Sequence, residues 1–374
     1  MIRCLRFLSR SSAIVAALVL AACGGEGARE AAPSYLDETP ASLSEWGQLI
    51  VAGGELRLAA GVEPYALATP LFSDYAGKLR TVWTPEGAAR YEADETFEFP
   101  VGTVITKTFY YPENDDGSVR RVTDEGTAHL GLSLADVRLV ETRVLVRRAA
   151  GWEAIPYVWN AEETEAVLKP VGAAYRLAFA EEDGGRTEFA YIVPNRNQCA
   201  GCHATNNTTR AIRPIGPKAR HLNRTLAYAE GEKNQLARWV RLGLLSDAPE
   251  DAPRAADWAD ASEPLAARAR AYLDINCAHC HNPVGPADTS GLYLDAGTPT
   301  GPAFGLCKLP IAAAQGTGGR KHDIAPGDPE ASILVYRMVS EDPAEMMPEL
   351  GRAVAHQEGV DLIRAWIAAI DGAC

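Results

Sequence analysis

Two short stretches, Cys199-Ala-Gly-Cys-His203 and Cys277-Ala-His-Cys-His281, repeat the pattern Cys-x-x-Cys-His in a chain of 374 residues. This pattern is typical of covalent attachment of c-type haem. Two thiols about one helical turn apart can reach the two vinyl groups of one porphyrin, and the adjacent imidazole then lies under the iron as proximal ligand. We therefore expect two haem c groups. The thioether bonds are assigned to Cys199, Cys202, Cys277 and Cys280, and the proximal iron ligands are His203 and His281.

Two other kinds of site also use paired cysteines. The four motif cysteines could form a structural zinc site, or each pair could form a redox-active disulfide. Neither explains why a His follows both pairs, so the haem interpretation is favoured. His279 occupies a variable position inside the second motif and is given no role.

The sequence around the second motif predicts two helices. Ser262 is a good N-cap, and apolar residues recur at helical spacing from Leu265 to Asn276, directly before the motif. The apolar face of a final helix is formed by Val360, Ile363, Trp366, Ile367 and Ile370.

Few methionines are available as the second axial ligand of an iron. After Met1 only Met338, Met346 and Met347 remain. Met347 precedes Pro348 in a loop sequence, whereas Met338 falls on a predicted helix and is expected in the core. A thioether ligand favours the ferrous state, so we predict Met347 as the distal ligand of the second iron, with Met346 as the alternative.

The distal ligand of the first iron is less defined, because no Met lies between His203 and Met338. His221 is a candidate, and ligation by two His would give a lower potential than His and Met. The alternatives are Lys218, a Met from the last domain, or an open iron that would permit catalysis.

Several residues are expected to support the second haem. A backbone carbonyl between Asn282 and Pro286 should accept the Nδ1 proton of His281 and fix its ring. Buried propionates need cations, and the candidates are Lys321, Arg337 and Arg352. The unassigned Cys307 and Cys374 are predicted to form a disulfide that ties the chain end to this domain.

The first 22 residues are typical of an export signal. Three Arg precede an apolar run at 13–20 that is too short to span a bilayer. The run ends in Leu20-Ala-Ala-Cys23, which resembles the lipobox of bacterial lipoproteins, so we expect lipidation of Cys23; an ordinary secretory signal with a spare Cys is the alternative. Gly24 in place of Asp then indicates the outer membrane, facing the periplasm or the cell surface.

The chain is acidic. Removal of residues 1–22, which carry three Arg and no acidic residue, changes the formal charge from −13 to −16. This excess of acidic residues argues against nucleic acid as a partner. It is compatible with a redox partner protein that carries a basic patch.

The C-terminal part resembles class I cytochrome c in the order of its features: a helix, the motif, a Met before Pro, and a closing helix with Trp366. The whole chain is similar to a family of poorly characterised bacterial dihaem cytochrome lipoproteins, and to cytochrome portions of some quinoprotein sugar dehydrogenase-like proteins. The resemblance implies two haems and a role in respiratory or dehydrogenase-linked electron flow, but it indicates no established substrate. His221 is a departure from the family pattern, because such proteins often have a different residue at this position. The phrases that carry the likeness are Thr69–Asp74, Phe99–Val104, Tyr157–Asn160, the first Cys-x-x-Cys-His motif, Asn234–Leu236 and Pro326–Ser332.

The chain is predicted to be a multi-domain protein, with a mainly antiparallel, sandwich-like β domain followed by an α-helical cytochrome c region. Alternating apolar runs separated by turn residues predict the β domain. The predicted order is a lipoprotein signal peptide (1–22), a flexible tether (23–39), the β-rich domain (40–195), a first haem-binding segment (196–246), a linker (247–260) and a domain resembling class I cytochrome c (261–374).

These features favour an electron carrier that relays electrons between a donor protein and an acceptor. A dihaem peroxidase-like enzyme, with an open first iron, is the main alternative, so whether the chain is an enzyme stays open. A third hypothesis makes the β domain a carbohydrate-binding or partner-binding module, because it is rich in aromatics. These are Trp83, Tyr110, Tyr111, Trp152 and Trp159, and at strand spacing such residues are more often core.

Overall fold

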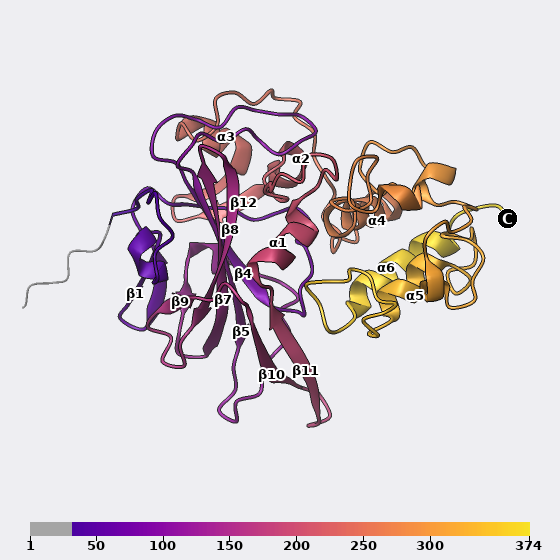
Figure 1. The fold of residues 1–374 in the computed structure, drawn as a ribbon, viewed down its shortest axis with the longest axis horizontal. Helices are drawn as coiled ribbons and strands as arrows, with labels where there is room; N and C mark the ends of the chain where they lie inside the picture. The colour runs from indigo at the N-terminus through magenta and orange to yellow at the C-terminus, as the bar shows by residue number, and fades with distance from the viewer. Residues whose placement is uncertain (1–31) are drawn as a thin grey trace, which may run out of the picture. The chain divides into compact units, whose positions relative to one another are not determined.

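The computed structural model describes residues 32–374 (Figure 1). The predicted signal segment, the predicted lipidation site at Cys23 and the first part of the predicted tether lie outside the described residues. Within residues 32–374, no helix combines the length and the apolar composition needed to span a bilayer.

A six-stranded antiparallel sheet forms the centre of the N-terminal part. Its strand order is β3-β4-β5-β7-β8-β9. The strands are β3 (Glu63–Pro64), β4 (Gly77–Trp83), β5 (Val104–Pro112), β7 (Val137–Arg148), β8 (Gly151–Trp159) and β9 (Ala166–Leu168). The alternating runs in the sequence fall on β5, β7 and β8, and side chains from both faces of these strands are buried, in separate apolar clusters.

Residues 32–374 also form three smaller sheets. One contains β1 (Leu49–Ala52), β2 (Glu55–Leu58) and β6 (Leu132–Ser133), and two hairpins are formed by β10 (Ala173–Ala180) with β11 (Arg186–Val193) and by β12 (Thr225–Tyr228) with β13 (Gly231–Asn234). The predicted antiparallel β region is confirmed as a region of several sheets.

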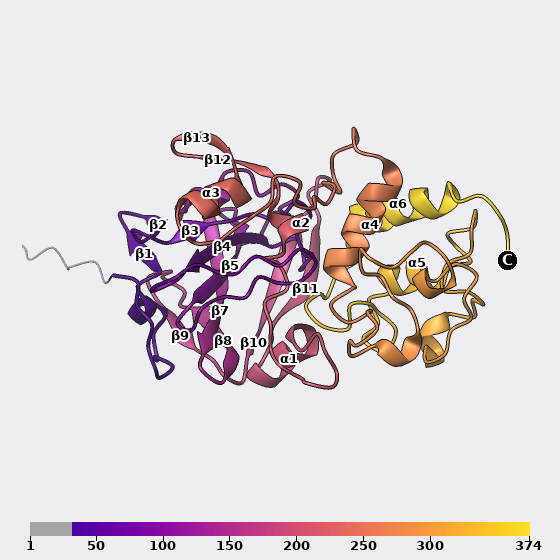
Figure 2. The same cartoon turned by 90° about the horizontal axis from the view of Figure 1, so that it is seen from above.

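Residues 196–246 share a core with the β region. The helices here are α1 (Arg196–His203), α2 (Ala219–Leu222) and α3 (Gln235–Arg241). Leu222, Leu236 and Trp239 pack in one cluster with Ile105 and Leu145 of the main sheet. Both views place α1 and α2 on the side of the β region that lies toward the C-terminal helices (Figures 1 and 2).

The C-terminal part is helical, as predicted. It contains α4 (Leu265–Asn276), α5 (Ile333–Val339) and α6 (Gln357–Ala368). The predicted apolar face of α6 is buried in one cluster with Leu273 of α4, and Ile370 packs against that cluster from beyond the helix end. The N-cap prediction at Ser262 is wrong, because α4 begins only after Pro264; the ring of a proline disfavours helical geometry in the preceding residue.

The predicted disulfide between Cys307 and Cys374 is present, and it closes a loop across 67 positions of the chain. It connects the C-terminus to the segment between the second motif and α5.

Candidate functional site

The second motif opens into a large cavity. Helix α4 ends at Asn276, and the motif follows as a turn in which the His281 N–H donates to the Cys277 carbonyl at 2.9 Å. A cavity of about 480 Å³ is lined by Cys277, Cys280, His281 and Met347. Its size is within the range of roughly 300–1,000 Å³ that is usual for ligand sites.

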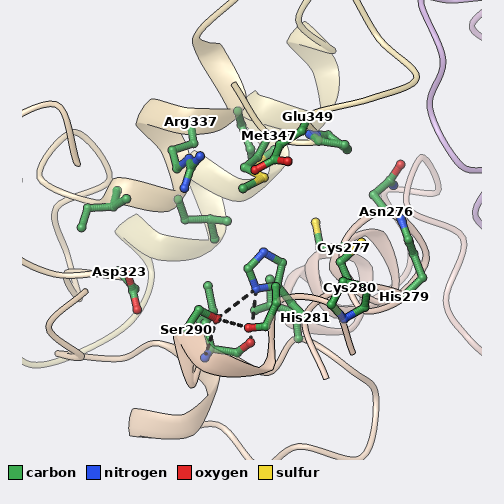
Figure 3. A pocket seen from close by; sticks show the side chains of 18 of the residues that line it. Asn276, Cys277, His279, Cys280, His281, Ser290, Asp323, Arg337, Met347 and Glu349 are labelled. Atoms are coloured by element: carbon green, nitrogen blue, oxygen red, sulfur yellow. Dashed lines mark hydrogen bonds between the residues drawn. The ribbon is translucent and has the colours of Figure 1, made fainter. Parts of the chain in front are cut away.

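His281 is oriented by its Nδ1 atom. This atom lies 3.3 Å from the Leu292 carbonyl oxygen and 3.5 Å from the Ser290 hydroxyl, a contact that can be followed in Figure 3. The prediction of a carbonyl between Asn282 and Pro286 is wrong. The carbonyls of Asn282 and Gly285 accept from N–H groups within the same turn, and the carbonyl that lies near His281 Nδ1 is that of Leu292.

Burial lowers the pKa of His281 to about 4. The imidazole is therefore neutral at pH 7, and with Nδ1 hydrogen bonded, the lone pair of Nε2 is free for a metal.

Met347 faces His281 across this cavity (Figure 3). Met346 is buried and does not line the cavity. Met338 touches the cavity but also belongs to the apolar core of the C-terminal part, as expected. Of the two neighbouring methionines, the structure brings the predicted one to the site.

Two of the three predicted propionate partners, Arg337 and Arg352, line the cavity, whereas Lys321 does not. Arg352 is 7% exposed. Its Nε donates to the Met347 carbonyl at 3.1 Å, and its Nη2 donates to the Ser340 carbonyl at 2.8 Å. Its Nη1 has no hydrogen-bond partner among residues 32–374.

Buried polar groups are normally paired, so this unpaired guanidinium nitrogen in the cavity wall suits an acidic ligand group. Two thiols, a neutral imidazole, an opposing thioether and a buried cation together fit a covalently held haem.

The first motif lies on α1. A capping box at Asn195 and Gln198 starts this helix, and the motif ends it. The His203 Nδ1 atom lies 2.7 Å from the Arg213 carbonyl oxygen, and burial lowers the pKa of His203 to about 3. As at the second motif, the Nε2 lone pair is free.

The cavity at the first motif is much smaller than the cavity at the second motif. The cavity that Cys199 and His203 line measures about 60 Å³. The donor set suits a haem, but a porphyrin needs the surrounding side chains to move. Long side chains from the main sheet, including those of Lys107 and Arg143, line this space.

A row of basic residues crosses the sheet opposite His203. Arg80 on β4 pairs with Lys107 on β5, which pairs with Arg143 on β7. Arg80 bonds Glu125 at 2.7 Å, and Arg143 bonds Glu141. Lys107 has no ion pair or side-chain hydrogen bond within the described part of the chain, and burial lowers its pKa to about 7. Sequence reasoning missed this row, because only the strand register aligns the three residues.

His221 is not brought to the first cavity. It is 1% exposed, and its Nε2 lies 3.2 Å from Asp274 Oδ2. Asp274 also forms an ion pair with Arg220. The His221 ring is therefore held at Asp274 and not in the cavity that His203 lines. Lys218 does not line this cavity either, and its Nζ lies 3.8 Å from Glu95. In residues 32–374, the cavity wall contains no Met and no His other than His203.

The two motifs contact each other. Cys280 Sγ lies 3.5 Å from the Gly201 carbonyl oxygen, and the Asn207 N–H donates to the Val284 carbonyl at 2.6 Å. Gly201 and Cys202 also line the second cavity. His279, given no role above, is buried in the same wall, and its Nδ1 has no partner among the described residues.

The geometry does not fit the zinc alternative. The four motif cysteines are unpaired, and residues 32–374 contain no cluster of three or more His, Cys, Asp or Glu arranged to hold a metal ion by themselves. Comparison with protein families, characterised proteins and solved structures finds no match to this chain.

Proposed function

We propose that the chain is a dihaem c-type cytochrome that transfers electrons in the cell envelope, between a dehydrogenase or respiratory donor and an acceptor protein. The observation that carries this proposal is the contact between the two attachment motifs. Cys280 and Gly201 are 79 positions apart in sequence, yet the Cys280 sulfur lies 3.5 Å from the Gly201 carbonyl. Cofactors attached at these motifs would be neighbours.

Haem iron supplies one-electron chemistry by cycling between the ferric and ferrous states. The residues of the chain would hold each haem and set the reduction potential of its iron. The motif cysteines anchor the ring, His203 and His281 present neutral nitrogens, and Met347 offers a soft thioether on the opposite side of the second cavity. Because Met favours the ferrous state, the second iron should have the higher potential.

The order of α4, the motif, Met347 and α6 supports a class I cytochrome c domain over residues 261–374. Residues 196–246, in contrast, use the main sheet as the other wall of the first site. On this proposal, the β region is part of the first haem site as well as a scaffold.

Several features support a location outside the cytoplasm. The Cys307–Cys374 disulfide is typical of an oxidising compartment. The lipobox-like sequence ending at Cys23 would anchor the chain to a membrane, with the outer membrane as the proposed site. The acidic balance suits a redox partner with a basic docking patch.

A dihaem peroxidase-like enzyme is the second candidate. The first cavity offers no Met and no further His within residues 32–374, and an open iron would bind a small substrate. The argument for a carbohydrate-binding β domain is weaker, because Tyr110, Tyr111 and Trp159 are buried in cores.

The decisive experiment is expression with the c-type haem attachment machinery, followed by intact mass and absorption spectra. Wild type should carry two covalent haems and show a far-red Met-to-iron band. Cys277→Ser with Cys280→Ser should lose one haem and this band together, whereas Cys199→Ser with Cys202→Ser should lose the other haem and keep the band in those chains that still carry the second haem. A chain without covalent haem would refute the proposal, and a high-spin haem with peroxide turnover would favour the enzyme.

A further inference from the structure

Two consecutive residues of the β region have unusual backbone conformations. Asp74 has φ 46° and Tyr75 has φ 55°. Left-handed geometry is strained for residues with a Cβ, and it persists only where surrounding contacts enforce it. Such strain often accompanies a functional role. We call residues Phe72–Tyr75, which precede β4, the clamp.

The clamp binds the loop that follows Met347. Asp74 Oδ1 accepts hydrogen bonds from the backbone N–H groups of Ala353 at 2.6 Å and Val354 at 2.9 Å. The Tyr75 hydroxyl accepts from the Gln357 N–H at 3.0 Å and donates to Glu358 Oε2 at 2.6 Å. The strained pair therefore fixes the loop and the start of α6.

The same clamp contacts the opposite wall of the second cavity. The Phe72 N–H donates to Asn276 Oδ1 at 2.8 Å, and Asn276 is the residue directly before Cys277. The Phe72 ring stacks on His356, with centroids 4.3 Å apart and planes 10° apart. Phe72, Asn276 and His356 all line the cavity.

A short path of contacts leads from Asp74 to Met347. Ala353, which Asp74 binds, is adjacent to Arg352, and Arg352 Nε donates to the Met347 carbonyl at 3.1 Å. Asp74 itself is buried at 3% exposure, and its carbonyl accepts from the Tyr111 hydroxyl at 2.6 Å. The loop is thus tied to β5 of the main sheet.

We propose that the clamp sets the distal side of the second haem site, with Asp74 as the positioning residue that holds the loop so that Met347 faces His281. This inference rests on the proposed function for the role of Met347. It assigns a task to the β region: the region determines how firmly the thioether is presented to the iron, and so tunes the second potential.

The test compares Asp74→Ala with Asp74→Asn in the full-length holoprotein. Asn keeps an oxygen that can accept both backbone N–H groups, whereas Ala removes it. In Asp74→Ala, amide hydrogen exchange at Ala353 and Val354 should accelerate roughly tenfold or more, the factor expected for losing a hydrogen bond to a charged group. The far-red Met-to-iron band should weaken and the second potential should fall, while Asp74→Asn should stay near wild type in all three readouts.

Retention of both the exchange protection and the band in Asp74→Ala would overturn the inference. If that variant fails to fold by circular dichroism, Tyr75→Phe provides the second test, because it removes only the hydroxyl bonds to Gln357 and Glu358. The same accelerated exchange near Gln357 is expected, and its absence would count against the clamp. If wild type carries no second haem, the proposed function fails, while the exchange comparison still decides whether the clamp holds the loop.

Discussion

Asp274 on α4 is the centre of a buried polar cluster that joins the two motif regions. It is 5% exposed. Arg220 Nε donates to Oδ2 at 2.7 Å and Arg220 Nη2 donates to Oδ1 at 3.0 Å, while His221 Nε2 lies 3.2 Å from Oδ2. Burial alone would raise the pKa of Asp274, but the hydrogen bonds from His221 and Arg220 outweigh it and hold this pKa well below its usual range.

Asp274→Asn should destabilise the folded protein by about 3 kcal/mol, the lower end of the cost of breaking a buried ion pair. The reason is that the Arg220 side chain, 12% exposed, keeps its charge without a carboxylate. The lower end applies because Arg220 Nη1 still donates to the Asp94 carbonyl at 2.6 Å. The measurement is denaturant-induced unfolding of both proteins at pH 7 in the same haem-loading state.

The matched control is Asp361→Asn. Asp361 lies 3.6 Å from Arg364, and the two side chains are 60% and 32% exposed. An exposed pair of this kind contributes roughly 0–1 kcal/mol, so this variant should unfold almost as wild type does.

The pH dependence of the unfolding free energy independently tests whether ionised Asp274 stabilises the folded protein. Because the folded pKa of Asp274 lies below the unfolded value of about 3.9, its contribution is complete above that value and is lost as the pH falls through the folded pKa. The stability gap between wild type and Asp274→Asn should therefore narrow as the pH is lowered from about 5 toward 2. A loss below about 1 kcal/mol at pH 7, or a gap that does not change with pH, would refute this reasoning.

Three further predictions follow from the sites. Met347→Ala should abolish the far-red band and lower the second potential by equilibrium titration, because the iron loses its thioether; an unchanged band would assign the ligand elsewhere. If Lys107, whose amine lines the cavity of His203 without an ion pair or side-chain hydrogen bond within residues 32–374, ligates the first iron, Lys107→Ala should convert the first haem from low-spin to high-spin by electron paramagnetic resonance; an unchanged signal would exclude it as a ligand. Replacement of both Cys307 and Cys374 by Ser should cost about 4 kcal/mol of unfolding free energy from loop entropy, and unfolding that matches oxidised wild type would contradict this.

The sequence was most informative where the signal is local. The apolar face of α6 follows from a spacing of 3.6 residues, and the alternating runs in β5, β7 and β8 follow from a spacing of two. The Cys307–Cys374 pair was predictable because the two motifs, the signal segment and the predicted lipidation site at Cys23 account for every other Cys. Met347 was selected by its type and by the Pro that follows it.

The features that sequence reasoning missed depend on contacts between distant segments. Lys107 aligns with Arg80 and Arg143 only through strand register. Asp74 reaches Val354 across 280 positions, and no local pattern indicates such a pairing. His221 has the right residue type for a ligand, but a buried carboxylate from another segment binds its ring.

The contact between the two motifs also has a consequence for how the protein matures. Gly201 and Cys202 form part of the wall of the second cavity, so this cavity is complete only after the first motif segment has docked against it. On the proposed function, the two attachment events are then coupled through folding. Chains that fail to load the first haem should also retain the second poorly, so that doubly loaded and empty chains outnumber singly loaded ones beyond what independent attachment would give.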